Sequence, residues 1–131
     1  MKVLFSIVLI LSLANLAFAQ GGDVQMGTAS YYANKFEGRK TSSGQVFRQD
    51  SLTCAHKTLP FGTRIEVRNL SNDSLVVVTV NDRLPKSSSR VVDLTMRAAR
   101  QLNFVKKGLT KVEIRVLGNK EEEVPTEENQ H

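Results

Sequence analysis

Cysteine is almost absent from this sequence, since Cys54 is the single thiol in 131 residues. One cysteine cannot form an intramolecular disulfide, so the chain is not a small scaffold held together by disulfide bonds. A lone cysteine is most often a small buried apolar residue. We therefore expect Cys54 in the core and assign it no chemistry.

Several motifs of common catalytic and binding sites are also missing. The sequence has no His-x-x-His pair, no cluster of Cys and His, no glycine-rich phosphate loop and no Gly-x-Ser-x-Gly segment. These absences argue against metal-dependent, nucleotide-dependent and serine-hydrolase chemistry. We expect neither a metal ion nor a cofactor.

Long apolar runs are missing outside the N-terminus, where Lys2 precedes VLFSIVLILSLANLAFA. The run ends in the small-x-small pattern Ala17-Phe18-Ala19, which signal peptidase accepts, and no charged stop-transfer flank follows it. Gln20 occupies the place where a lipoprotein carries cysteine. We expect a signal peptide at residues 1–19 and an exported product in the periplasm or the medium, without a lipid anchor or stable membrane insertion.

Charges of the two signs are unevenly distributed along the chain. Residues 20–117 hold 16 Lys/Arg against 8 Asp/Glu, a net charge of +8, whereas residues 118–131 hold one Lys against five Glu, a net charge of −4. Outside a cell, a basic domain meets anionic envelope polymers more readily than nucleic acid, although a merely solvated surface is the alternative. The acidic tail lacks apolar periodicity and is predicted to be disordered.

Short β-type patterns dominate the 112 residues after position 19, which suffice for one domain that folds without a partner, as a monomer. Strands or core-entering segments are predicted at 26–33, 52–58, 64–69, 75–80, 90–94 and 111–117. Polar loops are predicted at 34–51 and 81–89, and Thr95 can cap a short helix over residues 96–104. Closure into a small barrel would remove exposed sheet edges, so we predict a mainly β barrel with one short helix.

Asp82 has the most suggestive setting among the candidate acids and bases. It directly follows the apolar strand and precedes Arg83 and Pro85, which would hold a rigid turn. A carboxyl at the edge of an apolar core can have its pKa raised toward the range useful for acid catalysis. The alternative is an Asp that pairs with Arg83 or caps its own loop. The other candidates are Glu37, Asp50, Asp73, Asp93 and His56.

Five blocks carry a resemblance to a known family. They are GTASYYANKFEGRKTSSG, LTCAHKTLPFGTRIEVRN, VVVTVNDRLP, RVVDLTMRAARQL and VEIRVL. In order and spacing they resemble the rare lipoprotein A (RlpA) domain, which implies a six-stranded double-psi β-barrel. The resemblance covers about residues 26–117, so residues 20–25 are expected to be a short linker and 118–131 a tail.

The resemblance implies endolytic cleavage of peptidoglycan glycan strands, preferably strands stripped of stem peptides. An acidic residue protonates the glycosidic oxygen between N-acetylmuramic acid and N-acetylglucosamine, then takes the C6 hydroxyl proton as a 1,6-anhydro ring closes. By its place in the Asn-Asp-Arg-x-Pro block, Asp82 is the expected catalytic residue. His56, Arg83 and Tyr31 are expected to line the same groove.

Two positions depart from the pattern of active family members. These commonly read Thr-Ala-Asn-Gly-Glu-x-Phe-Asp, whereas this chain has Gln45 and Arg48 in place of the two carboxylates. Both positions belong to the family's proposed active-site set, and their change would lower the pKa of Asp82. A non-catalytic peptidoglycan-binding module is therefore the alternative function. A third reading is an expansin-like wall-loosening or eukaryotic secreted protein.

Overall fold

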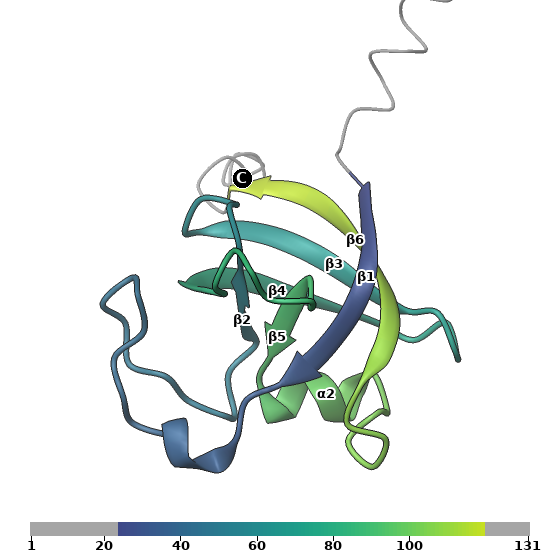
Figure 1. Ribbon diagram of the computed structural model, residues 1–131, viewed down its shortest axis with the longest axis horizontal. Coiled ribbons are helices and arrows are strands. Elements are labelled where there is room, and N and C mark those ends of the chain that lie inside the picture. Colours follow the sequence, from purple (N-terminus) through teal and green to yellow (C-terminus); the bar gives the residue numbers. More distant parts are fainter. Residues whose placement is uncertain (1–23, 120–131) are drawn as a thin grey trace, which may run out of the picture.

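The computed structural model describes residues 24–119, and this part of the chain closes into a β-barrel (Figure 1). Its strands are β1 (Val24–Tyr31), β2 (Thr53–His56), β3 (Thr63–Asn69), β4 (Leu75–Arg83), β5 (Val92–Leu94) and β6 (Thr110–Asn119). Its helices are the 3-10 turn η1 (Asn34–Phe36) and α2 (Met96–Gln101). The predicted signal peptide, residues 20–23 of the predicted linker and nearly all of the predicted tail lie outside the described residues.

The strands follow the order β1-β5-β2-β4-β3-β6 around the barrel, and β6 pairs back with β1. The pairs β1/β5 and β2/β4 are parallel, and the other neighbouring pairs are antiparallel. Six strands, closure and one short helix confirm the predicted fold class. Within residues 24–119, no helix has the length and apolar character needed to cross a membrane.

Period-2 alternation places apolar side chains inside the barrel. In β3, Ile65 and Val67 are fully buried, whereas the intervening Arg64 and Glu66 are partly exposed. The apolar side chains of β4, β5, α2 and β6 complete one continuous core, and Cys54 lies within it at 0% exposure. Burial raises the pKa of the Cys54 thiol, which keeps it protonated and unreactive, as expected for a structural cysteine.

The end of β4 differs from the sequence prediction. Residues 81–83 were expected at the start of a polar loop, but β4 continues through Arg83. Parallel pairing with β2 holds this extension, with Ala55 beside Asp82 and His56 beside Arg83. These polar residues look like a loop in the sequence because the strand leaves the apolar core there. The backbone stays extended because it pairs with the neighbouring strand β2.

The short helix α2 is shorter than predicted. The Thr95 hydroxyl accepts a hydrogen bond from the Ala98 amide at 3.3 Å, which confirms the predicted N-cap. The helix ends at Gln101 and not at residue 104, because Asn103 adopts a left-handed backbone with φ 60°. This turn directs Phe104 into the core, where it is 2% exposed.

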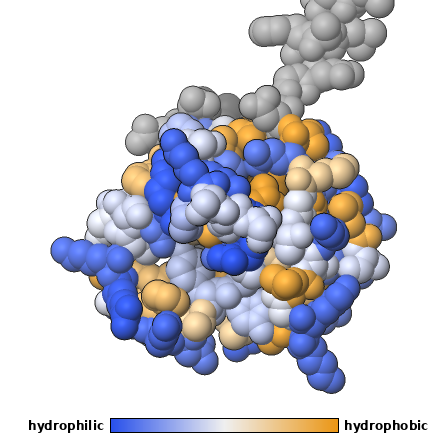
Figure 2. Space-filling model, in the orientation of Figure 1, coloured by the Kyte–Doolittle hydropathy of each residue, from blue (hydrophilic) through white to orange (hydrophobic). Residues whose placement is uncertain are grey.

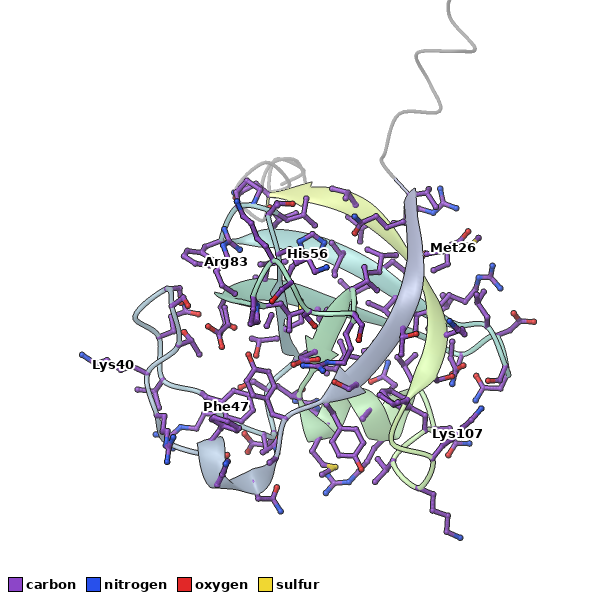
Figure 3. The ribbon with its side chains drawn as sticks, viewed as in Figure 1. Met26, Lys40, Phe47, His56, Arg83 and Lys107 are labelled. Atoms are coloured by element: carbon purple, nitrogen blue, oxygen red, sulfur yellow. The ribbon has the colours of Figure 1, made fainter. Side chains whose placement is uncertain are left out.

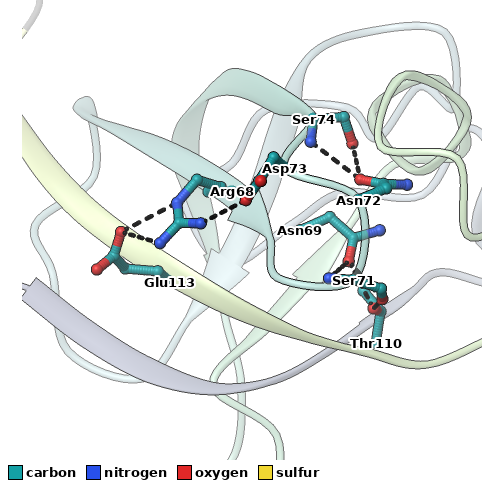
Figure 4. A network of polar contacts seen from close by, with 8 residues as sticks. All are labelled: Arg68, Asn69, Ser71, Asn72, Asp73, Ser74, Thr110 and Glu113. Carbon is teal, nitrogen blue, oxygen red and sulfur yellow. Dashed lines mark hydrogen bonds and ion pairs between the residues drawn. The ribbon is translucent and has the colours of Figure 1, made fainter.

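A buried amide ties the β3–β4 hairpin to the rest of the barrel (Figure 4). Asn69 is 2% exposed, and its Oδ1 accepts hydrogen bonds from Thr110 Oγ1 at 2.8 Å and from the amide of Ser71 at 3.0 Å. Its Nδ2 donates to the carbonyl of Leu102 at 2.8 Å. One side chain therefore links the hairpin, the segment after α2 and the start of β6.

Candidate functional site

A cleft of about 640 Å³ lies between the barrel and the long segment that joins β1 to β2. This segment stands at the left of the barrel in Figure 1, and hydrophilic side chains cover much of the same face in Figure 2. The polar and charged lining residues are Ser30, Tyr31, Tyr32, Arg39, Lys40, Asp82, Arg83, Arg90 and Asp93. The volume falls in the range typical of ligand pockets, so this cleft is the candidate site.

Strand register brings two carboxylates to one row of the barrel wall. Ala55 in β2 pairs with Asp82 on one side and with Asp93 on the other, and Asp93 in turn pairs with Ser30 in β1. Neighbouring strands lie about 4.8 Å apart, so the backbones of the two aspartates are separated by about 10 Å. Both aspartates line the cleft, with only the small Ala55 side chain between their strands.

The Asp82 carboxylate is held by three hydrogen-bond donors. The Tyr32 hydroxyl donates to Oδ2 at 2.5 Å, and the amides of Ser42 and Arg83 donate to Oδ1 at 2.8 Å and 2.9 Å. Because Ser42 belongs to the segment that joins β1 to β2, this contact also fixes that segment to the end of β4. The carboxylate orientation is therefore set by groups from three parts of the chain.

The pKa of Asp82 is lowered and not raised, contrary to the expectation from the apolar strand that precedes it. Burial of the carboxyl opposes ionisation, but the hydrogen bonds from Tyr32, Ser42 and Arg83 favour the charged form and outweigh it. The expectation of a raised pKa was wrong because it considered the apolar strand before Asp82 and not the donors that face it. The lowering expected from Arg48 has the right sign but another cause, since the donors are Tyr32, Ser42 and Arg83. In the free protein, Asp82 is therefore ionised near neutral pH.

Tyr32 is the residue that controls Asp82 most directly. Its ring is half-buried against Phe47, with ring centroids 4.2 Å apart, and Phe47 is only 2% exposed. Burial and the hydrogen bond to Asp82 raise the pKa of the Tyr32 hydroxyl, so it stays protonated and donates.

The variant Tyr32→Phe keeps the ring and removes this donor, so the pKa of Asp82 should rise. A lowered carboxyl pKa stabilises the fold above the unfolded-state value of about 4, and this stabilisation is lost as the pH falls through the folded-state pKa. The stabilisation that arises from Asp82 should therefore be smaller in the variant, and its loss should be complete at a higher pH than in the original protein. Carbon-13 NMR titration of the Asp82 carboxyl measures the pKa shift, and an unchanged pKa would contradict the assigned role of Tyr32.

Asp93 is the second carboxylate of the cleft, and it carries a different set of partners. Arg90 donates to both of its oxygens, from Nε at 2.7 Å and from Nη2 at 3.1 Å, and the Ser30 hydroxyl donates at 2.5 Å. This two-point contact fixes the orientation of the Asp93 carboxylate. The negative charge of Asp93 thereby neutralises the positive charge of Arg90 within the cleft.

Two other residues expected in the groove, Arg83 and Tyr31, line the cleft with Asp82. The Arg83 guanidinium lies over the Phe61 ring, 4.2 Å from its centroid, and Nη1 is 3.4 Å from the carbonyl oxygen of His56. The Tyr31 hydroxyl instead donates to the carbonyl of Val105 at 2.7 Å and is thereby tied to the core side of β1.

The structure does not bring His56 into the cleft that holds Asp82. His56 is 2% exposed and lines a neighbouring cavity beside Gln25. Its Nδ1 accepts hydrogen bonds from the amides of Thr58 and Leu59, both at 3.1 Å, which places the ring proton on Nε2, 2.9 Å from Gln25 Oε1. Burial and the nearby Arg83 and Lys57 lower the pKa of His56, so the neutral ring organises the turn after β2.

Gln45 and Arg48 also lie outside this cleft. The Gln45 side chain accepts a hydrogen bond from Asn81 Nδ2 at 3.1 Å, and both residues line a separate cavity beside Phe61 and Gly62. The Arg48 guanidinium forms an ion pair with Glu37 at 3.3 Å. Any part that Gln45, Arg48 or His56 takes in substrate binding stays a prediction.

Sequence reasoning missed Tyr32, Ser30 and Arg90 as lining residues and listed Asp93 only as one acid among several. Alternation in β1 could have identified Ser30, because the buried Ala29 before it faces the core and leaves Ser30 on the other face, whereas Tyr32 follows the last residue of the strand. The spacing of three residues between Arg90 and Asp93 is only a weak indication in the sequence that the two side chains pair. Its place beside Asp82 depends on the parallel and antiparallel pairing around β2, which the local sequence does not reveal.

Comparisons with known proteins agree with this architecture. The sequence profile of the family described as "Lytic transglycolase" matches residues 24–114. The chain is 43% identical over 97 residues to "Endolytic peptidoglycan transglycosylase RlpA" of Campylobacter jejuni, which covers 74% of this chain and 35% of that protein. It is 45% identical over 94 residues to "Probable endolytic peptidoglycan transglycosylase RlpA" of Synechocystis, with 72% and 29% covered. The chain thus spans about a third of the length of these curated relatives.

Solved structures with similar folds have much less similar sequences. The Streptomyces papain inhibitor aligns with a TM-score of 0.58 and 21% identity, over 72% of this chain and 96% of that one. The apo expansin of Clavibacter michiganensis aligns with a TM-score of 0.60 and 17% identity, over 80% and 53%. At this level of identity the similarity supports the fold alone.

Proposed function

Because this chain belongs to the lytic transglycolase family, we propose that it cleaves the glycan strands of peptidoglycan without hydrolysis. The observation that carries the proposal is the Asp82 carboxyl, which strand β4 and three hydrogen-bond donors hold at the wall of a cleft of about 640 Å³. The names of the similar RlpA proteins support the same activity. The substrate would be the bond between N-acetylmuramic acid and N-acetylglucosamine in peptide-stripped strands.

One carboxyl group can perform both proton transfers of this reaction. Protonated Asp82 gives its proton to the glycosidic oxygen while the bond from that oxygen to C1 breaks. The C6 hydroxyl oxygen then bonds to C1, and its proton returns to the Asp82 carboxylate. No water is consumed, so the product ends in a 1,6-anhydro ring, unlike the products of glycosidases that use two carboxylates to bring in water.

The reaction needs a protonated Asp82 carboxyl, and substrate binding would favour this form. Asp82 has a lowered pKa before binding, and a saccharide in the cleft would exclude water from the carboxyl and raise this pKa. Because the protonated form starts the reaction, kcat/KM should fall as the pH rises above the pKa of Asp82 in the free protein. A kcat/KM profile for strand cleavage that is flat between about pH 4 and pH 7 would contradict this assignment.

The non-catalytic alternative rested on Gln45 and Arg48. Since neither residue lines the cleft and Arg48 pairs with Glu37, their identities do not remove a carboxylate from its walls. We therefore favour catalysis over binding alone. A place of action in the cell envelope or outside the cell, as a monomer, is part of the same proposal, as is export into the periplasm or the medium.

The direct test is mass spectrometry of the products that the purified protein forms from denuded glycan strands. We expect fragments that end in 1,6-anhydro-N-acetylmuramic acid and internal cleavage that shortens long strands early in the reaction. Reducing ends in place of anhydro ends would indicate hydrolysis, and intact strands would contradict the proposed activity.

A further inference from the structure

The charged residues of the cleft do not balance. Four cationic residues, Arg39, Lys40, Arg83 and Arg90, line the cleft with only two carboxylates, Asp82 and Asp93. When all six groups are ionised, the cleft walls carry two positive charges in excess. A cleft with this excess favours an anionic group on its ligand.

Two of the four cations are poor candidates for binding that anion. Arg90 already makes two hydrogen bonds to Asp93, so its charge is matched. Lys40 lies at the outer rim, and its side chain points away from the barrel in Figure 3. The excess charge that faces a ligand therefore belongs to Arg39 and Arg83.

The guanidinium groups of Arg39 and Arg83 each lie over a phenylalanine ring. The Arg39 guanidinium lies over the Phe36 ring at 5.4 Å from its centroid, and the Arg83 guanidinium lies over the Phe61 ring at 4.2 Å. Within residues 24–119, neither arginine forms an ion pair with a carboxylate. The aromatic rings hold the two planar groups in place without neutralising their charge or occupying all of their donors.

We infer that Arg39 and Arg83 form a binding site for the free carboxylates of muramic acid residues in the glycan strand. This inference rests on the proposed function. A muramic acid residue carries a lactyl carboxylate only when no stem peptide is attached, because the peptide converts this group into a neutral amide. A guanidinium binds a carboxylate through two parallel N–H donors and a charge that an amide cannot match. The two arginines would thus make the cleft selective for peptide-free strands.

The test measures binding apart from cleavage, in an Asp82→Asn background that prevents turnover. The probes are fluorescent denuded glycan oligosaccharides, either with free muramic carboxylates or with the same carboxylates coupled to methylamine. We expect at least tenfold tighter binding of the free-carboxylate form at low salt, and a preference that shrinks as salt increases.

The variants Arg39→Gln and Arg83→Gln should each weaken binding of the free-carboxylate form about tenfold and leave binding of the methylamide form unchanged. Arg100→Gln is the matched control, because it removes the same charge from an exposed position on α2 outside the cleft. Equal binding of the two glycan forms would overturn the inference, and so would a preference that both cleft variants retain.

The inference and the proposed function fail in distinguishable ways. If the protein with intact Asp82 produces anhydro ends at equal rates from both glycan forms, the proposed function holds and the arginine site is refuted. If the carboxylate preference is measured but no anhydro ends form, the arginine site holds and the proposed function is refuted.

Discussion

Replacement of Asp82 by Asn is expected to reduce the formation of anhydro products about a thousandfold. The amide has nearly the same shape as the carboxyl, and its oxygen can still accept a hydrogen bond from the Ser42 amide, the Arg83 amide or the Tyr32 hydroxyl. It cannot give a proton to the glycosidic oxygen and take one back from the C6 hydroxyl. The rate of product formation from denuded strands, followed by mass spectrometry, measures the loss.

Two controls make this result specific to chemistry. Asp50→Asn removes an exposed carboxylate of the same type outside the cleft and should leave the rate unchanged. Asp82→Asn should also retain binding of denuded oligosaccharides, because Arg39 and Arg83 are unchanged. A variant that keeps more than a tenth of the original rate would show that another group, with Asp93 as the first candidate, transfers the proton.

The second large effect is on stability. Asn69→Ala should lower the free energy of unfolding by about 3 kcal/mol, because it removes four hydrogen bonds of a buried amide and takes the acceptor Oδ1 away from the buried Thr110 hydroxyl. The groups affected are the Thr110 hydroxyl, the Ser71 amide and hydroxyl, and the Leu102 carbonyl. Urea unfolding monitored by circular dichroism measures the change.

The neighbouring turn offers a matched comparison. Asn72 is exposed, and its Oδ1 accepts hydrogen bonds from the amide and the hydroxyl of Ser74 (Figure 4). Water can replace these partners, so Asn72→Ala should cost less than about 1 kcal/mol. Equal losses from the two variants would mean that the turn, and not the buried link to β6, accounts for the role of Asn69.

Much of the fold was predictable because it is encoded locally. The alternation in β3 predicted the strand and the face that it buries, and Thr95 predicted the start of α2. Where strands end was less predictable: β4 continues through Asp82 and Arg83 because β2 offers a partner there. Asn103 ended the helix early through a backbone conformation that its sequence neighbours did not require.

The candidate site was also predictable only in part from the sequence. The apolar pattern before Asp82 predicted that it follows a buried strand, and the resemblance of five blocks identified it as the expected catalytic residue. It could not determine the pKa of Asp82, because the donors Tyr32 and Ser42 lie 50 and 40 positions away along the chain. Electrostatic shifts depend on distances in space, so the apolar strand predicted the wrong sign and Arg48 suggested the wrong cause.

The tertiary structure determines which charged groups share one cleft. Barrel closure sets Asp93 beside Asp82 through β2, pairs Arg90 with Asp93, and leaves Arg39 and Arg83 on aromatic supports without carboxylate partners among the described residues. The sequence fixes the number of charges. Their pairing follows from strand order and register, which arise from long-range contacts that no local pattern contains.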